Sequence, residues 1–160
     1  MNPTHLHLLL NHAPVFGTIF GFALLAFALW RKSEELKKTA LGVFVVFTLL
    51  AVPVYLSGEP AEHAVKQLPG ISKPIIEKHE DAAAIAFTGI VVLGVVALAG
   101  LLLFRRTKIM PVWFSLIMLA AALIVGGLMA WTANLGGQIR HPEIRPGFNP
   151  PAASADQHHD

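Results

Sequence analysis

Histidines are the residues of this chain whose type and spacing best suit chemistry. The chain has eight of them, and two flank an asparagine in the stretch His7–Pro14, which reads HLLLNHAP at the start of the first apolar segment. An imidazole nitrogen can bind a metal ion or a haem iron. Ionisable residues at or inside a membrane segment are costly, so they indicate a functional site. We therefore expect a site near this stretch.

The composition indicates a membrane protein. Of the 160 residues, 54% are hydrophobic and 14% are charged, whereas soluble domains carry about 25% charged residues. The chain has no cysteine, which excludes thiolate ligands and iron–sulfur clusters built from its own residues. No phosphate-binding loop, nucleophile–base pair or nucleic-acid patch is visible. An electron carrier or a subunit of a complex is therefore favoured over a stand-alone enzyme.

Four apolar segments predict an all-α integral membrane four-helix bundle with up-down-up-down topology. A helix needs about 20 apolar residues to cross the hydrocarbon core. We expect a transmembrane domain over residues 1–145, with helices at about 3–30, 39–56, 74–104 and 111–133 and a short outer helix at 60–68. The first segment lacks the positively charged start of a cleaved signal, so we expect it to be retained. Residues 146–160, rich in proline, alanine and polar residues, predict a disordered tail.

The distribution of positive charge predicts the orientation in the membrane. Basic residues concentrate in the two short connections, before the second and fourth helices, and the positive-inside rule makes both connections cytoplasmic. Both termini and all the histidines then face the periplasm, or the extracytoplasmic side, of a bacterial inner membrane. The basic residues concerned are Arg31, Lys32, Lys37, Lys38, Arg105, Arg106 and Lys108.

The pair His12 and His79 is the strongest candidate for a cofactor site. The first and third helices lie diagonally across an up-down-up-down bundle, which would bring the two histidines to similar depth. Two histidines facing each other can ligate a haem iron axially. Gly17 and Gly21 form a GxxxG pattern, which either admits a flat macrocycle or simply packs helices. The leading hypothesis is an electron-transfer subunit that binds haem b near the outer face.

Two further hypotheses stay open. His7 lies five residues before His12, on a different helix face, and His141 follows the fourth helix, so either can belong to the same site. A copper or zinc site would draw on His12, His79, His7, His141 and His63. A cofactor-free subunit of a larger membrane complex is the third hypothesis. Expected partners are the lipid bilayer and another redox protein, or a second copy through GxxxG; no nucleic acid is expected.

Several short motifs resemble those of the domain of unknown function 2231 family. His7, His12 and Pro14 match the histidine–proline motif that opens the family's first helix, although Leu8 stands where a proline is usual. The other motifs are Ser57-Gly58 after the second helix, His79 in the third helix, and Gly136, Gly137 and His141 after the fourth. The resemblance implies a small bacterial four-helix membrane protein. It implies no established activity, although relatives joined to Rieske-type domains suggest electron transfer.

Overall fold

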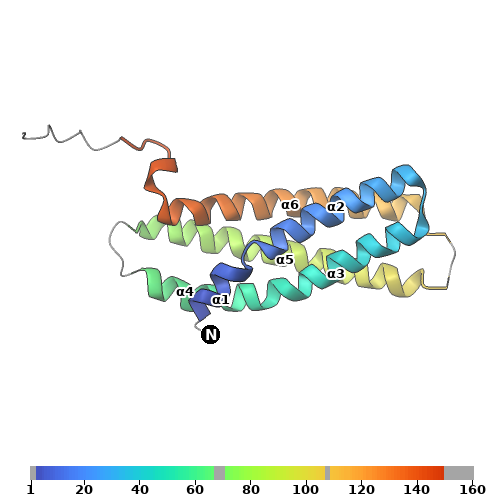
Figure 1. Ribbon diagram of the computed structural model, residues 1–160, viewed down its shortest axis with the longest axis horizontal. Helices are drawn as coiled ribbons and strands as arrows, with labels where there is room; N and C mark the ends of the chain where they lie inside the picture. Colours follow the sequence, from blue (N-terminus) through green and yellow to red (C-terminus); the bar gives the residue numbers. More distant parts are fainter. Residues whose placement is uncertain (1–2, 67–70, 107–108, 150–160) are drawn as a thin grey trace, which may run out of the picture.

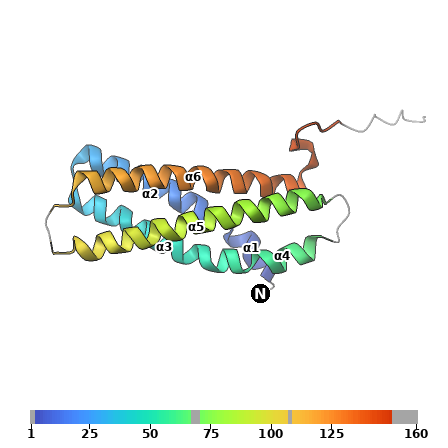
Figure 2. The same cartoon turned by 180° about the vertical axis from the view of Figure 1, so that it is seen from behind.

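The computed structural model describes residues 3–66, 71–106 and 109–149, and these residues form helices without any strand. In chain order the elements are α1 (Pro3–Leu10), α2 (Ala13–Arg31), α3 (Glu34–Leu56), α4 (Gly58–Val65), α5 (Lys73–Leu103), α6 (Val112–Arg140) and the short 3-10 helix η1 (Pro142–Ile144). Figure 1 shows the four long helices side by side, and Figure 2 shows the same bundle from behind.

Each long helix packs against two neighbours. The pairs in contact are α2 with α3, α3 with α5, α5 with α6 and α2 with α6. Helices α2 and α5 therefore occupy opposite corners, as the up-down-up-down topology predicted. Figure 1 shows α1 and α4 at one end of the bundle, where α1 packs on α3 and α4. We call this the histidine end, and the end with the α2–α3 and α5–α6 connections the basic end.

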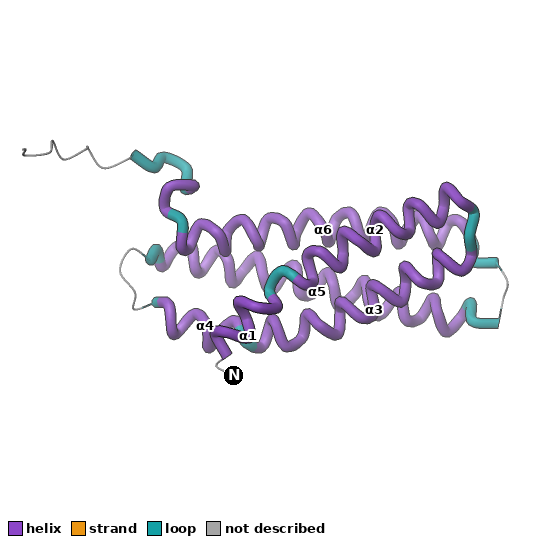
Figure 3. The backbone as a smooth tube through the Cα atoms, viewed as in Figure 1, coloured by secondary structure: helices purple, strands orange, loops and turns teal. Residues whose placement is uncertain are grey.

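The first apolar segment is two helices rather than the single helix predicted over residues 3–30. Figure 3 shows the interruption between α1 and α2, which falls at Asn11 and His12. Pro14 has no backbone N–H, so the carbonyl four residues earlier loses its helical donor. The backbone resumes its helical bonds when the Phe16 N–H donates to the His12 carbonyl at 3.0 Å. Pro14 thus kinks the segment, and the kink turns α1 away from α2 onto α3 and α4.

Two other helices extend beyond their predicted limits. Helix α3 begins at Glu34 because the Ser33 side chain accepts a hydrogen bond from the Leu36 N–H at 3.3 Å, which is the usual role of an N-cap serine. Helix α6 continues to Arg140 through Gly136 and Gly137. These glycines, which stand after the predicted end of the fourth helix, lie within it. The turn comes at His141, before η1.

At the basic end, the carboxylate of Glu34 bonds to two other residues. Glu34 accepts a hydrogen bond from the Met110 N–H at 2.6 Å and pairs with Lys37 at 2.7 Å. Lys37 is only 4% exposed, so the ion pair lies inside the bundle end. Glu34 thereby joins the start of α3 to the connection before α6.

The outer surface of the bundle is apolar. Large side chains such as Phe16, Leu49, Val95 and Leu123 are each more than half exposed. Among the described residues, four helical stretches are long and apolar enough to cross a membrane; the first runs through α1 and α2 and the second through α3 and α4. Helix α5 has 31 residues, or about 46 Å at 1.5 Å per residue, against about 30 Å of hydrocarbon. Its ends would therefore project beyond the hydrocarbon core, and His79 lies near one of them.

Candidate functional site

His7 is fixed between α1 and the end of α3. Its Nδ1 lies 3.0 Å from the carbonyl oxygen of Val54 and 3.3 Å from the hydroxyl of Ser57. The Ser57 hydroxyl donates to the same carbonyl at 2.9 Å. Val54 is one of the last four residues of α3, whose carbonyls lack an intrahelical partner. His7 and Ser57 together therefore satisfy this helix end, and the ring lies beside Gly58.

His79 is held in the same way by a different helix. Its Nδ1 lies 3.0 Å from the carbonyl oxygen of Thr132 in α6. A Cβ atom at Gly136 would lie 3.1 Å from Cε1 of this imidazole, which is closer than ordinary contact. The ring of His79 therefore packs directly on the backbone of α6, and only a glycine leaves the ring its full space.

Both imidazole rings use Nδ1 for the hydrogen bond to a carbonyl, which leaves Nε2 of each ring for another partner. A carbonyl oxygen can only accept a hydrogen bond, so Nδ1 carries the proton in both histidines, and in the neutral ring Nε2 keeps its lone pair. A hydrogen bond from one ring nitrogen to a backbone carbonyl is the usual support for a histidine that binds a metal through the other. Both rings therefore have this kind of support, with Nε2 left for a ligand.

Asn11 adds an unsatisfied acceptor near His7. Its Oδ1 atom is buried and has no hydrogen-bond partner in the described part of the chain. Asn11 is four residues after His7, and the Asn11 N–H donates to the His7 carbonyl at 2.8 Å. Residues four apart in a helical turn lie on the same face. Asn11 therefore sits one turn deeper than His7, on the side that His7 presents to the bundle.

His12 does not share this environment. It is exposed, and its ring stacks on Phe16, with ring centroids 6.4 Å apart. The interruption at Asn11 and His12 places His7 against α3 while His12 begins α2 on the outer surface. His7 and His79 therefore share one kind of support at the histidine end, and His12 lacks it. The pairing of His12 with His79 stays a prediction, and the kink is what gives His12 surroundings different from those of His7.

Gly17 and Gly21 are buried and are covered by rings from α3. A Cβ atom at Gly17 would overlap the ring of Phe47, and one at Gly21 would meet the ring of Phe44. The GxxxG pattern therefore packs α2 against α3. The space that a macrocycle would need beside these glycines is filled by phenylalanine.

The remaining histidines lie apart from this pair. His141 is exposed and its Nδ1 lies 2.7 Å from Glu143, whose pKa is held below its ordinary value by a hydrogen bond from its own backbone and then by His141. His63 is exposed, 4.0 Å from Glu59 on α4, and His5 is exposed on α1. His158 and His159 lie outside the described residues. Within the described ranges no three His, Cys, Asp or Glu side chains gather.

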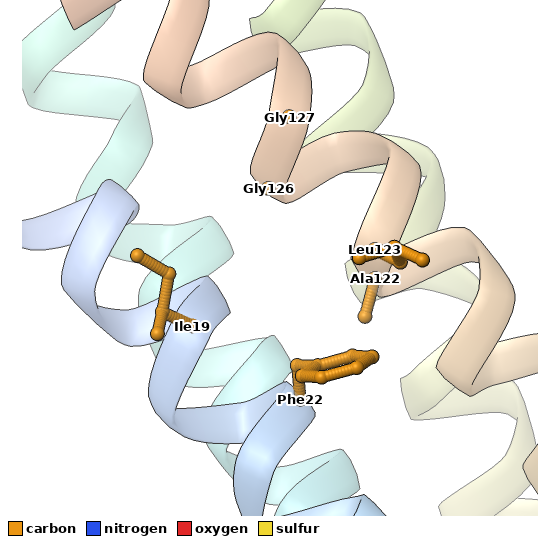
Figure 4. A pocket seen from close by; sticks show the side chains of 6 residues that line it. All are labelled: Ile19, Phe22, Ala122, Leu123, Gly126 and Gly127. Carbon is orange, nitrogen blue, oxygen red and sulfur yellow. The ribbon is translucent and has the colours of Figure 1, made fainter.

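Two cavities open on the outer surface, away from the histidines. One, of about 280 Å³, lies between α2 and α6 (Figure 4). The other, of about 100 Å³, lies between α3 and α5 beside Thr48 and Gly94. Both are lined mainly by apolar side chains and glycine. The larger is lined by Ile19, Phe22, Ala122, Leu123, Gly126 and Gly127.

Reasoning from the sequence did not find the backbone carbonyls that hold His7 and His79, nor the buried Oδ1 atom of Asn11 that has no hydrogen-bond partner among the described residues. A backbone acceptor such as Val54 or Thr132 has no sequence signal. The proximity of Gly58 to His7 and of Gly136 to His79 does follow motifs that were visible in the sequence. Comparison with known protein families, with curated proteins and with solved structures found no match.

Proposed function

We propose that this chain is a multi-pass membrane protein that holds a metal centre at the histidine end through Nε2 of His7 and Nε2 of His79. The observation that carries the proposal is the shared support of the two rings. Each Nδ1–H donates to a backbone carbonyl at 3.0 Å, and both residues lie at the histidine end of the bundle. Two histidines that are held in the same way at one end, each with Nε2 free, suit a shared ligand.

A single copper or zinc ion is the form of the centre that the geometry favours. The buried, unpartnered oxygen of Asn11 lies on the same helix face as His7, and an ion with open coordination positions can use such an oxygen. Copper would support electron transfer at this face, whereas zinc would act as a structural ion or a Lewis acid.

Haem b is the second candidate. It needs only two protein ligands, because the porphyrin supplies four nitrogens, and two imidazoles are what the described chain brings together. His7 and His79 would hold it, whereas Gly17 and Gly21 would not border it, since phenylalanine rings cover both glycines. In this form the protein would be an electron-transfer subunit, as the sequence first suggested.

The proposed location is a bacterial inner membrane with the basic end in the cytoplasm and the histidine end outside. Support comes from the basic residues in the two short connections and from the exposed Trp30 and Trp113 near the same end. Membership of the domain of unknown function 2231 family is part of this proposal. It is supported by the clustering of the Ser57-Gly58 and Gly136 motifs around the two histidines.

Optical spectroscopy combined with metal analysis of the purified, detergent-solubilised protein tests these candidates. A haem spectrum with iron supports the second form, and copper or zinc at one ion per chain without haem supports the first. A colourless protein that holds no metal, and takes up neither metal nor haem when they are added, would contradict both. It would leave the cofactor-free subunit as the function.

A further inference from the structure

We infer that Asn11 is the third protein ligand of this centre, and that the site takes a bare first-row divalent cation, Zn²⁺ or Cu²⁺. The inference rests on the proposed function, because it assumes that His7 and His79 bind the metal. It deepens that function by making the Asn11 oxygen a required ligand, which a haem iron with two histidine ligands has no position to accept.

The first step is the state of the Asn11 side chain. A buried acceptor without a partner costs about 1–3 kcal/mol, and each such group in a native protein calls for an explanation. The Oδ1 atom of Asn11 is buried although the residue as a whole is half-buried. The amide oxygen therefore points into the protein, where it lacks a donor.

The second step is the kind of partner that is missing. With each Nδ1 protonated, the two histidines offer only the lone pairs of Nε2, and Asn11 offers the lone pairs of Oδ1. A set made only of acceptors suits a cation and would repel an anion. A metal ion is the compact partner that satisfies all of them.

The third step is the position of Asn11 in the backbone. The kink at Asn11 and His12 ends α1 immediately after the turn that carries His7. One helical turn separates His7 from Asn11, a rise of about 6 Å, and side chains four apart lie one above the other. A long imidazole and a short amide on one helix face can therefore bind one ion, and in this inference His79 of α5 completes its protein ligands.

The fourth step is the chemistry of the donor set. Two imidazole nitrogens, one amide oxygen and a water molecule make a four-coordinate set. Zinc accepts nitrogen and oxygen ligands in tetrahedral geometry, and Cu²⁺ accepts the same ligands in tetragonal geometry. A bis-histidine haem iron has no position left for Asn11, so haem would leave this oxygen unsatisfied.

The test is titration of Zn²⁺ or Cu²⁺ into the full-length, chelator-treated protein, with a competing chelator to measure Kd. The Asn11→Leu variant removes the oxygen ligand at similar volume, and we expect its Kd to rise by about tenfold or more. Asn11→Asp supplies an anionic oxygen and should bind at least as tightly as the wild type. The matched control is Asn134→Leu, since Asn134 is exposed on α6 and its loss should leave Kd unchanged.

Stability of the metal-free protein provides a readout that separates a ligand from a structural residue. If Asn11 is a ligand, Asn11→Leu should raise the Tm of the metal-free protein while weakening metal binding, because the unsatisfied buried oxygen is removed. A structural asparagine would instead lower Tm when replaced. Electron paramagnetic resonance of the copper-loaded wild type adds a test without substitutions: two coordinated imidazole nitrogens are expected, and three or more would overturn the inference.

The outcomes also separate this inference from the proposed function. Wild-type affinity in Asn11→Leu, together with lost binding in His7→Ala and His79→Ala, would remove Asn11 from the site and leave the function standing. Wild-type affinity in both histidine variants would overturn the function and the inference together. Replacing His158 and His159 with alanine in the full chain should change neither result.

Discussion

Substitution of Gly136 by alanine should disturb the site through a single methyl group. The new Cβ atom would lie 3.1 Å from Cε1 and 3.4 Å from Nδ1 of His79. The first distance is tighter than ordinary contact, so the ring must shift by a few tenths of an ångström. Nδ1 is the atom that donates to the Thr132 carbonyl at 3.0 Å. The shift therefore strains the hydrogen bond that orients the ring.

The size of the effect follows from the rigidity of the ring. An imidazole about 30° off its preferred rotamer costs about 0.5–1.5 kcal/mol. A shift of a few tenths of an ångström is a smaller rotation, so the loss in metal affinity should stay below about tenfold. Alanine also favours the helix over glycine by about 1 kcal/mol. The metal-free Tm should therefore change little while the affinity falls.

Metal titration with two control variants isolates the contact. Gly127→Ala lies in the same helix, and its Cβ atom would meet nothing within 4 Å, so stability should rise and affinity should stay constant. Gly58→Ala would place its Cβ atom 3.7 Å from Cε1 of His7, an ordinary contact, and should bind normally. Equal metal affinity in Gly136→Ala and Gly127→Ala would refute the argument that the backbone of α6 orients His79.

Three other predictions concern the orientation in the membrane, the backbone strain at Lys32 and the tail of residues 146–160. Since the chain has no cysteine, a cysteine at Ser72 should react with a membrane-impermeant thiol reagent in intact cells and one at Arg106 should not; the reverse pattern would contradict the orientation. Lys32 has φ +51°, a conformation that costs a non-glycine residue about 1–2 kcal/mol. The Tm of Lys32→Gly in thermal unfolding should therefore be higher than the Tm of Lys32→Ala, and equal Tm values would refute the strain. Ending the chain after Arg145 should leave folding and metal content unchanged in a purified sample, because residues 146–160 have little apolar surface to bury; lost metal would implicate the tail.

The helical elements were predictable because apolar length and proline placement are local signals. Pro14 marked the kink, and Ser33 stands at the start of α3 as an N-cap. The extension of α6 was not predictable from composition. Gly136 and Gly137 usually end helices, yet here they stay helical because His79 packs on Gly136 and the Arg145 side chain donates to the carbonyls of Gln138 and Ile139 at 2.8 and 3.1 Å.

The composition of the site was predictable in part. The concentration of histidines at one end follows from the sequence, and His7 and His79 were among the candidates. The choice of His7 over His12 depends on which way the chain turns at Asn11, and that direction is set by packing of α1 on α3 and α4. Backbone acceptors at Val54 and Thr132 carry no side-chain signal, so the tautomer of each ring could be known only from the structure.

The central claim, that His7 and His79 together hold a metal centre, is tested most directly by the metal content of purified variants. Wild-type protein and His12→Ala should each retain one metal centre per chain, because His12 is exposed on the outer surface. His7→Ala and His79→Ala should each lose it while keeping the helical circular dichroism spectrum. Loss in His12→Ala with retention in His7→Ala would contradict the account and would restore the pairing of His12 with His79.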